Sequence, residues 1–130
     1  MRFLSYISIM VKNLDQEGLK SIVNRYDLFF IDLWGVVHNG IELYENSINV
    51  LDNLAAAKKD FILLTNAPRP NETVINFLKK MGLKKYFENV FTSGEAAHKY
   101  LISHLGKKNF FHIGPPKDFD LFKNIEKTNV

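Results

Sequence analysis

The stretch DLFFIDLWGVVHNG, residues 27–40, decides the fold of this chain. Apart from Asp27 and Asp32, residues 27–33 are apolar. A strand that is apolar on both faces is typical of the centre of a parallel sheet. A carboxylate at the end of such a strand costs free energy unless it is paired or bound to a metal. Asp32 is therefore a candidate functional residue.

Helical and extended patterns alternate along the rest of the chain. Helices are expected at 14–26, 46–60, 72–82 and 95–105, and strands at 27–33, 61–66, 89–93 and 109–114, with a further helix beginning at 118–127. This alternation predicts an α/β fold, a Rossmann-like parallel sheet with helices on both faces. Right-handed crossovers should set the first three strands side by side. Ser93 is expected to cap the helix that follows it.

The composition excludes several classes of protein. The chain has 130 residues, a size that fits one domain, and 46% of them are apolar. It contains no cysteine, which excludes disulfides, thiolate metal sites and thiol nucleophiles and fits a reducing compartment. Its lysines are not interleaved with aromatic residues, so nucleic acid is not an expected partner. No segment reaches the roughly 20 apolar residues of a membrane span, so we expect a cytoplasmic protein.

A second polar pair follows the next apolar strand. Thr65 and Asn66 end the strand expected at 61–66, about one βαβ unit after Asp32. Adjacent strands lie about 4.8 Å apart, and ligands bind α/β sheets beyond the carboxyl ends of the strands. The Asp32 carboxylate and the Thr65 hydroxyl are therefore expected to face one small volume at the edge of the sheet.

These segments resemble one known family. An apolar strand ending in Asp32, with Gly35 close behind it, and a second strand ending in Thr65-Asn66 resemble motifs I and II of the haloacid dehalogenase (HAD) superfamily. Together, IDLWGVVHNG, FILLTNAPRP, VFTSGEAAHKYL and FFHIGPP resemble its subfamily IIA, which includes p-nitrophenyl phosphatase-like members. Within subfamily IIA, the chain is most similar to a subgroup with Trp at the second position of motif I.

The resemblance implies the amino-terminal part of such a hydrolase. Residues 1–25 would form a helical lead-in, residues 26–93 the first half of a HAD-like core, and residues 94–130 the start of a truncated α/β cap. In the family, a lysine of motif III and an acidic pair of motif IV follow the cap, and neither is found up to Val130. The core is therefore expected to be incomplete.

The resemblance also implies roles for the residues at the strand ends. Asp32 would be the nucleophile that accepts a phosphoryl group as an aspartyl-phosphate. The Asp32 carboxylate and the backbone carbonyl of Trp34 would ligate Mg²⁺. Thr65 and the backbone N–H of Asn66 would bind a phosphate oxygen, and Gly35 would let the loop approach the phosphate. The implied function is Mg²⁺-dependent, phosphatase-type phosphoryl transfer on a small phosphorylated metabolite.

Trp34 is the main departure from the family pattern. Active members usually carry a second Asp at this position as general acid and base. Tryptophan offers one N–H donor and no useful pKa, and loss of positioned acid–base catalysis costs about 10²–10⁴-fold in rate. The Trp34 side chain could close the pocket, stack on a ligand ring or pack under the loop.

The missing motifs leave two readings of the function open. Without the acids of motif IV, Mg²⁺ binding should be weak, and the enzyme should be weak or inactive as this chain. The alternative is a non-catalytic remnant or binding module, or one piece of a split gene. The first strand would have an unpaired apolar edge, which favours association. Self-association or a complementing chain is therefore expected.

Other polar residues carry weaker signals. His38 could touch substrate, although local hydrogen bonding within its loop is favoured. Arg69 could reach a phosphate or lie at the surface. His98 and His104 lack ligand spacing and are expected at the surface, and His112 is expected in the core or at the edge of a strand. A two-component receiver domain has a similar sheet, but it needs an acid pair at the end of the first strand and its phosphoacceptor on a later strand. Here Asp32 stands alone on the first strand, so a receiver domain is not expected.

Overall fold

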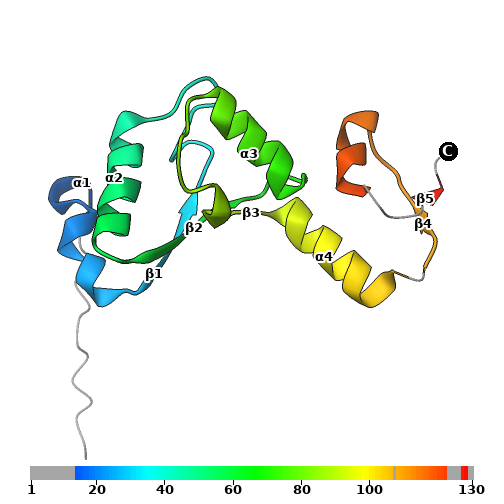
Figure 1. The fold of residues 1–130 in the computed structure, drawn as a ribbon, viewed down its shortest axis with the longest axis horizontal. Helices are drawn as coiled ribbons and strands as arrows, with labels where there is room; N and C mark the ends of the chain where they lie inside the picture. The colour runs from blue at the N-terminus through cyan, green and yellow to red at the C-terminus, as the bar shows by residue number, and fades with distance from the viewer. Residues whose placement is uncertain (1–13, 107, 123–126, 129–130) are drawn as a thin grey trace, which may run out of the picture.

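The computed structural model describes residues 14–106, 108–122 and 127–128. At its centre is a parallel sheet with the strand order β1-β2-β3 (Figure 1). Its strands are β1 (Leu28–Asp32), β2 (Asp60–Thr65) and β3 (Val90–Thr92). The predicted α/β class and the side-by-side placement of the first three strands are confirmed.

Two helices make the crossovers between these strands. Helix α2 (Glu45–Ala56) joins β1 to β2, and helix α3 (Asn71–Lys80) joins β2 to β3. The remaining elements, in which η denotes a 3-10 helix, are α1 (Leu14–Glu17), η1 (Leu19–Ser21), η2 (Val23–Arg25), η3 (Phe87–Asn89), α4 (Ser93–Leu105), β4 (Phe110–Phe111), η4 (Pro116–Phe122) and β5 (Lys127–Thr128). In the part of the chain that the structure describes, no helix is both long and apolar enough to cross a membrane.

The expectation of one continuous helix over residues 14–26 is wrong. Gly18 has a φ of 69° and separates α1 from the short helices η1 and η2. A residue with positive φ cannot continue a right-handed helix, and glycine adopts that conformation at little cost. The apolar side of the segment still packs inward, because Leu19 and Val23 contact the core.

The two faces of the sheet differ in burial. Parallel pairing sets Phe29 opposite Phe61 and Ile31 opposite Leu63, so these side chains share one face. On that face Leu63 is fully buried, whereas the next residue, Leu64, points to the other face and is 41% exposed. The expectation that β1 is a central strand buried on both faces is therefore wrong for the described residues, because β1 lies at the edge of the three-stranded sheet, with Phe29 and Ile31 half-buried on one face and Leu28 and Phe30 exposed on the other.

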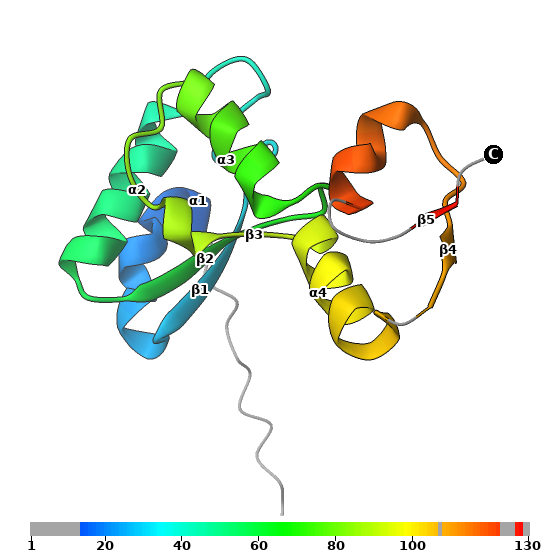
Figure 2. The same ribbon diagram turned by 45° about the vertical axis from the view of Figure 1, so that its right-hand side comes forward.

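The crossover helices cover the buried face, and α4 approaches the other. Figure 2 shows α2 and α3 on the same side of the sheet and α4 leading away from the end of β3. The amino group of Lys99 in α4 lies 5.4 Å from the centre of the Phe91 ring. Phe91 pairs in register with Leu64 and so shares its face. The buried helix residues in the core are Leu51, Leu54, Val74 and Leu78.

The carboxyl-terminal segment is less regular than the sequence predicts. The strand expected at 109–114 is reduced to β4, which pairs in parallel with β5. Pro115 and Pro116 follow closely, and proline cannot donate a hydrogen bond to a sheet. His112 lies after this strand, with 4.6 Å between the centre of its ring and that of Phe122. The helix expected at 118–127 is the 3-10 helix η4, and residues 123–126 lie outside the described residues.

Leu63 and Leu64 test the assignment of the two faces, because they are adjacent in sequence and differ in burial. Leu63→Ala should lower the free energy of unfolding by about 2–5 kcal/mol, since it leaves a cavity in a packed core. Leu64→Ala should lower it by no more than about 1 kcal/mol. Urea denaturation followed by circular dichroism measures both values. Equal losses for the two variants would contradict the proposed faces.

Candidate active site

The loop after β1 is a compact turn that presents Asp32 and Trp34. The Leu33 carbonyl accepts hydrogen bonds from the N–H groups of Val37 at 2.8 Å and His38 at 3.1 Å. The side chains of Leu33 and Val37 are buried and anchor the turn in the core. The Leu33 N–H donates to Oδ1 of Asp32 at 2.8 Å, which orients the carboxylate. The turn therefore fixes Asp32 at the carboxyl end of β1 while leaving it exposed.

Gly35 is required by the shape of this turn. Its φ is 77°, a left-handed conformation that glycine adopts readily. Its N–H donates to the His38 carbonyl at 2.8 Å and so closes the turn. Among the hydrogen bonds of the described residues, none ends on the Trp34 carbonyl.

The loop after β2 holds Thr65 and Asn66. The Thr65 side chain is nearly buried, and its hydroxyl oxygen accepts a hydrogen bond from the Ala67 N–H at 3.3 Å. Asn66 is exposed. The Ala67 carbonyl accepts from the Gly94 N–H at 3.1 Å, so the start of α4 supports this loop from behind.

Gly94 makes that support possible. A Cβ atom at this position would lie 2.3 Å from the backbone nitrogen of Arg69, closer than atoms can approach. The Thr92 hydroxyl donates to the Arg69 carbonyl and accepts from the Glu95 N–H at 2.9 Å. Thr92, rather than the expected Ser93, is therefore the N-cap of α4. The Ser93 hydroxyl instead donates to the Ala67 carbonyl at 3.0 Å.

The strand ends bring Asp32 and Thr65 to one hollow from opposite faces. Asp32 pairs in register with Leu64, so its side chain is on the exposed face of the sheet, whereas Thr65 points to the buried face. Both residues nevertheless line a hollow of about 550 Å³, together with Phe30, Trp34, Leu64 and Asn66. The expected common volume exists, but it is a shallow surface hollow that Asp32 and Thr65 approach from different sides.

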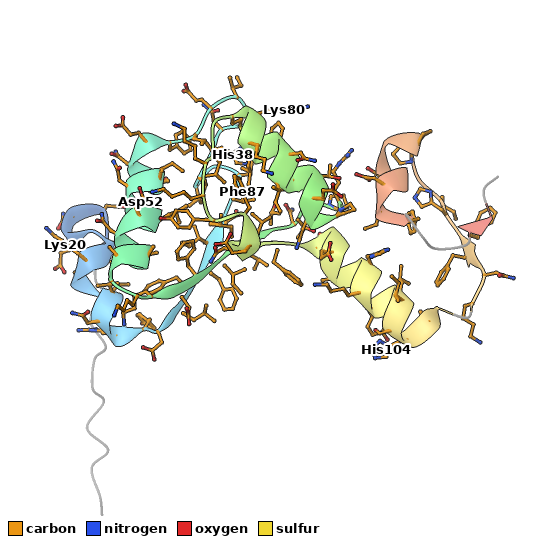
Figure 3. The ribbon with its side chains drawn as sticks, in the orientation of Figure 1. Lys20, His38, Asp52, Lys80, Phe87 and His104 are labelled. Carbon is orange, nitrogen blue, oxygen red and sulfur yellow. The ribbon has the colours of Figure 1, made fainter. Side chains whose placement is uncertain are left out.

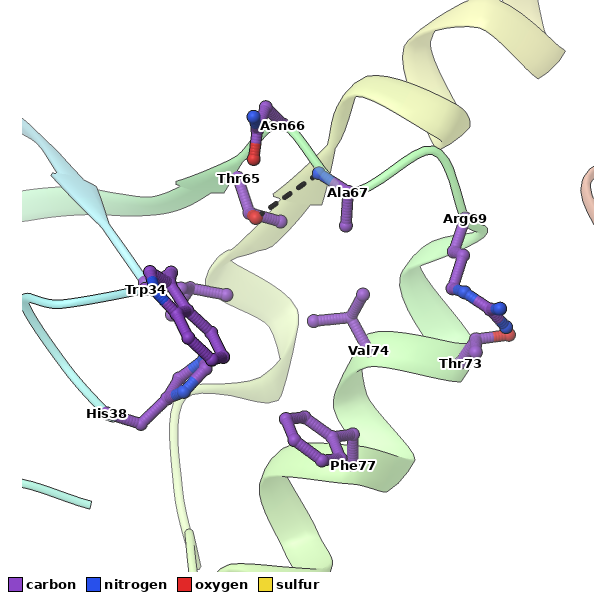
Figure 4. Close-up of a pocket in the computed structure, with 10 residues that line it drawn as sticks. Trp34, His38, Thr65, Asn66, Ala67, Arg69, Thr73, Val74 and Phe77 are labelled. Carbon is purple, nitrogen blue, oxygen red and sulfur yellow. Dashed lines mark hydrogen bonds between the residues drawn. The ribbon is translucent and has the colours of Figure 1, made fainter. Parts of the chain in front are cut away.

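A second cavity of about 400 Å³ lies beside this hollow (Figure 4). Its lining residues are Leu33, Trp34, His38, Thr65, Asn66, Ala67, Arg69, Thr73, Val74 and Phe77. Trp34, Thr65 and Asn66 line both spaces, so the two are neighbours. Sequence reasoning missed Thr73 and Phe77. They stand four positions apart on α3 and share a helix face, which is the signal that could have revealed them.

Trp34 does not pack under its loop. Its side chain is 64% exposed and rests against Gly40, where a Cβ atom would lie 2.5 Å from Cη2 of the indole. The Trp34 and His38 rings are nearly perpendicular, with 5.6 Å between their centres. Gly40 and His38 therefore hold an exposed aromatic surface at the junction of the two spaces.

His38 is a buried histidine that supports Trp34. It is 5% exposed, and its Nδ1 accepts a hydrogen bond from the Gly40 N–H at 2.9 Å. Its ring also meets that of Phe77, with 5.7 Å between the centres. Burial lowers the pKa of His38, and the nearby negative charge of Asp32 opposes this shift. The interpretation of a locally hydrogen-bonded loop histidine agrees with these contacts. Figure 3 places His38 inside the molecule between the turn and α3.

Arg69 is engaged by the carboxyl-terminal segment. Its guanidinium lies 3.4 Å from Asp120 and 3.8 Å from Asp118, both in η4. The Thr73 hydroxyl donates to the same Asp120 carboxylate at 2.9 Å. Arg69 and Thr73, two of the polar residues that line the cavity, are therefore already bound to η4.

The donors suit a weakly held cation of the magnesium type. The described residues contain no group of three His, Cys, Asp or Glu side chains that could hold a metal ion. Asp32, whose side chain is exposed, and Trp34 both line the hollow at the end of β1. Mg²⁺ prefers oxygen ligands, keeps several waters and is often bound through one or two carboxylates plus a substrate phosphate. This partial set fits such an ion only with help from water and phosphate.

Comparison with known families identifies the class of the protein. The profile of the haloacid dehalogenase-like hydrolases matches residues 29–127. The chain belongs to this family, and the resemblance inferred from its motifs is confirmed. No curated protein matches the chain.

Solved structures share this fold. A haloacid dehalogenase-like hydrolase from Brucella suis 1330 is 30% identical with a TM-score of 0.72, over 94% of this chain and 44% of its own. A 4-nitrophenylphosphatase from Thermotoga maritima is 24% identical with a TM-score of 0.65, over 78% of this chain and 40% of its own. A glycerol phosphate phosphatase from Mycobacterium tuberculosis, in complex with magnesium, is 22% identical with a TM-score of 0.61, over 84% of this chain and 33% of its own. The chain spans less than half the length of these proteins.

The lowered pKa of His38 predicts a pH-dependent stability. Between the folded pKa and about 6.5, the unfolded chain binds a proton that the folded chain does not, so stability should fall as the pH drops through this window. His38→Asn keeps an acceptor for the Gly40 N–H without titrating and should lose this part of the pH dependence. Urea midpoints at pH 7.5 and 5.5 measure the effect. If the urea midpoint of His38→Asn falls as much between pH 7.5 and pH 5.5 as that of the wild-type chain, the assignment is refuted.

Proposed function

We propose that this chain carries the nucleophile part of a subfamily IIA phosphohydrolase that acts on small phosphate monoesters. The single observation that supports it most is the position of Asp32. Its carboxylate is exposed at the carboxyl end of β1 and lines one hollow with Thr65 and Asn66, in a chain of the haloacid dehalogenase-like hydrolase family. In parallel α/β sheets this edge is where ligands bind.

The first chemical step is attack of an Asp32 carboxylate oxygen on the phosphorus of the bound ester. The bond between phosphorus and the ester oxygen breaks, and its electron pair leaves with that oxygen. The Thr65 hydroxyl and the Asn66 N–H stabilise the charge on the transferring phosphoryl group. Water then cleaves the aspartyl-phosphate, which restores the Asp32 carboxylate and releases phosphate, and its proton passes to solvent.

Asp32 and the Trp34 carbonyl would together hold Mg²⁺, which would neutralise part of the phosphate charge when bound. Because the described residues contain no cluster of acidic or histidine side chains that would complete such a site, binding should be weak without a phosphate. Trp34 supplies no acid or base, so both the departure of the leaving group and the hydrolysis of the intermediate should be slow.

The organisation of the chain follows from the same proposal. Residues 26–93 would form the first half of the catalytic core, residues 1–25 a lead-in and residues 94–130 the start of a cap, in a cytoplasmic protein. The rival reading, a non-catalytic binding module, predicts phosphate binding without turnover. A complementing chain that supplies further acids would raise the activity under the first reading alone.

Asp32→Asn tests the role of the nucleophile. The variant should lose all Mg²⁺-dependent hydrolysis of 4-nitrophenyl phosphate, because an amide cannot form the aspartyl-phosphate. Asp27→Asn is the matched control, since Asp27 is an exposed acid next to the amino-terminal end of β1, away from the site. It should keep wild-type activity. Activity that survives in Asp32→Asn would overturn the assignment.

Trp34→Asp tests the missing acid–base group. Restoring a carboxylate at this position should raise the steady-state rate by about 10²-fold or more, within the range of general acid–base catalysis. The gain should be largest for alkyl phosphates, whose leaving groups need a proton. Trp34→Phe, which changes the ring without adding an acid, serves as the control. A rate for Trp34→Asp no higher than that of Trp34→Phe would show that acid–base chemistry does not limit this chain.

A further inference from the structure

The loop between β1 and α2 contains Asn39 and Gly40, the single place in the chain where glycine follows asparagine. In such a pair the backbone nitrogen of the glycine can attack the side-chain amide carbon of the asparagine, because no Cβ atom obstructs the approach. The attack closes a cyclic imide and expels ammonia. Asn39 and Gly40 are both half-buried rather than enclosed, so water can reach the product.

Two hydrogen bonds prepare the amide of Asn39 for this attack. Its Oδ1 accepts from the N–H groups of Ile41 and Glu42, both at 2.9 Å. The ring that the first of these bonds closes contains the Gly40 nitrogen, so the amide is folded forward over the residue that would attack it. Two N–H donors on one carbonyl oxygen are also the arrangement that stabilises an oxyanion, which forms when a nucleophile adds to the carbon.

The attacking nitrogen has a proton acceptor of its own. The Gly40 N–H donates to Nδ1 of His38 at 2.9 Å. A ring nitrogen within hydrogen-bond reach of the proton to be removed has the geometry of a general base. The His38 ring is also fixed in place, because it lies across the rings of Trp34 and Phe77 with 5.6 and 5.7 Å between the centres.

We propose that Asn39 and Gly40 form a self-modification site, at which the folded chain converts Asn39 to an aspartyl residue. The Gly40 nitrogen bonds to the side-chain amide carbon of Asn39 while its proton passes to His38. The bond from that carbon to the side-chain nitrogen then breaks, and the nitrogen takes up the proton and leaves as ammonia. Water opens the imide at one of its two carbonyls, which gives aspartate or, with the backbone running through the side chain, isoaspartate.

The two products affect the loop differently. Aspartate has the length of asparagine, and its carboxylate can accept from the Ile41 and Glu42 N–H groups as the amide does. Isoaspartate inserts a methylene into the backbone before Gly40, where a Cβ atom would already lie 2.5 Å from the Trp34 indole. Aspartate should therefore preserve the position of Trp34, and isoaspartate should displace it.

The test compares the folded chain with the chain unfolded in urea, at one neutral pH and one temperature. Peptide mass spectrometry follows the conversion of the Asn39 amide to an acid, and hydroxylamine traps the imide. A fixed backbone by itself would slow the reaction, whereas positioned proton transfer contributes about 10²–10⁴-fold, so the folded chain should react at least about tenfold faster. A folded chain that converts Asn39 no faster than the unfolded chain would overturn the proposal.

Asn46 is the internal control in the same samples. It also precedes a small residue, Ser47, but it lies in the regular backbone of α2. Its conversion should be slower in the folded chain than in urea, the opposite of what is expected for Asn39. If folding speeds both residues equally, the effect comes from the solvent and the assigned site is contradicted.

His38→Asn tests the proton acceptor. Asparagine keeps an acceptor for the Gly40 N–H but is no base, so conversion of Asn39 in the folded variant should fall at least about tenfold, with no change in urea. Asn39→Gln should abolish the mass change in this peptide, since its longer side chain must close a larger ring. Folded His38→Asn that reacts as fast as the wild-type chain would refute the role of His38. The comparison of folded and unfolded wild-type chain needs no variant, so it decides the proposal even where a variant does not fold.

Discussion

The parallel pairing of β1 with β2 is the interaction on which the rest of the structure depends. Its register sets Asp32 opposite Leu64, so the residues that follow each strand meet at one edge of the sheet. Shifting the pairing by one residue would move Leu63 from the core to solvent and would turn every side chain of β2 over. The buried face thus fixes the register, and the register in turn places the acid beside Thr65 and Asn66.

Two glycines convert this edge into a shaped site. Gly94 lets the start of α4 approach the Arg69 backbone, which braces the loop after β2. Gly40 leaves room for the indole of Trp34, which then rests on Gly40 and His38 instead of entering the core. Backbone packing behind the site and ring packing beside it therefore determine which surfaces remain open to a ligand.

The sequence predicts more of the sheet than of the site. Apolar runs with Asp32 and Thr65 at their ends were sufficient for the strands, because periodicity and strand order follow from local pattern and crossover handedness. Gly18 broke a predicted helix, since the apolar spacing carries no information on a positive φ. Phe77 was missed because its contact with His38 joins residues far apart in sequence, and no periodicity reports such contacts.

The central claim is that Asp32 becomes phosphorylated. The most direct measurement incubates the chain with 4-nitrophenyl phosphate and Mg²⁺, quenches it in acid and maps the phosphoryl group by mass spectrometry of its peptides. The account predicts an acid-stable, hydroxylamine-sensitive phosphoryl group on Asp32, because slow hydrolysis at a site without a second Asp should let the intermediate accumulate. Release of nitrophenol with no label on Asp32, or with the label on another residue, would contradict it.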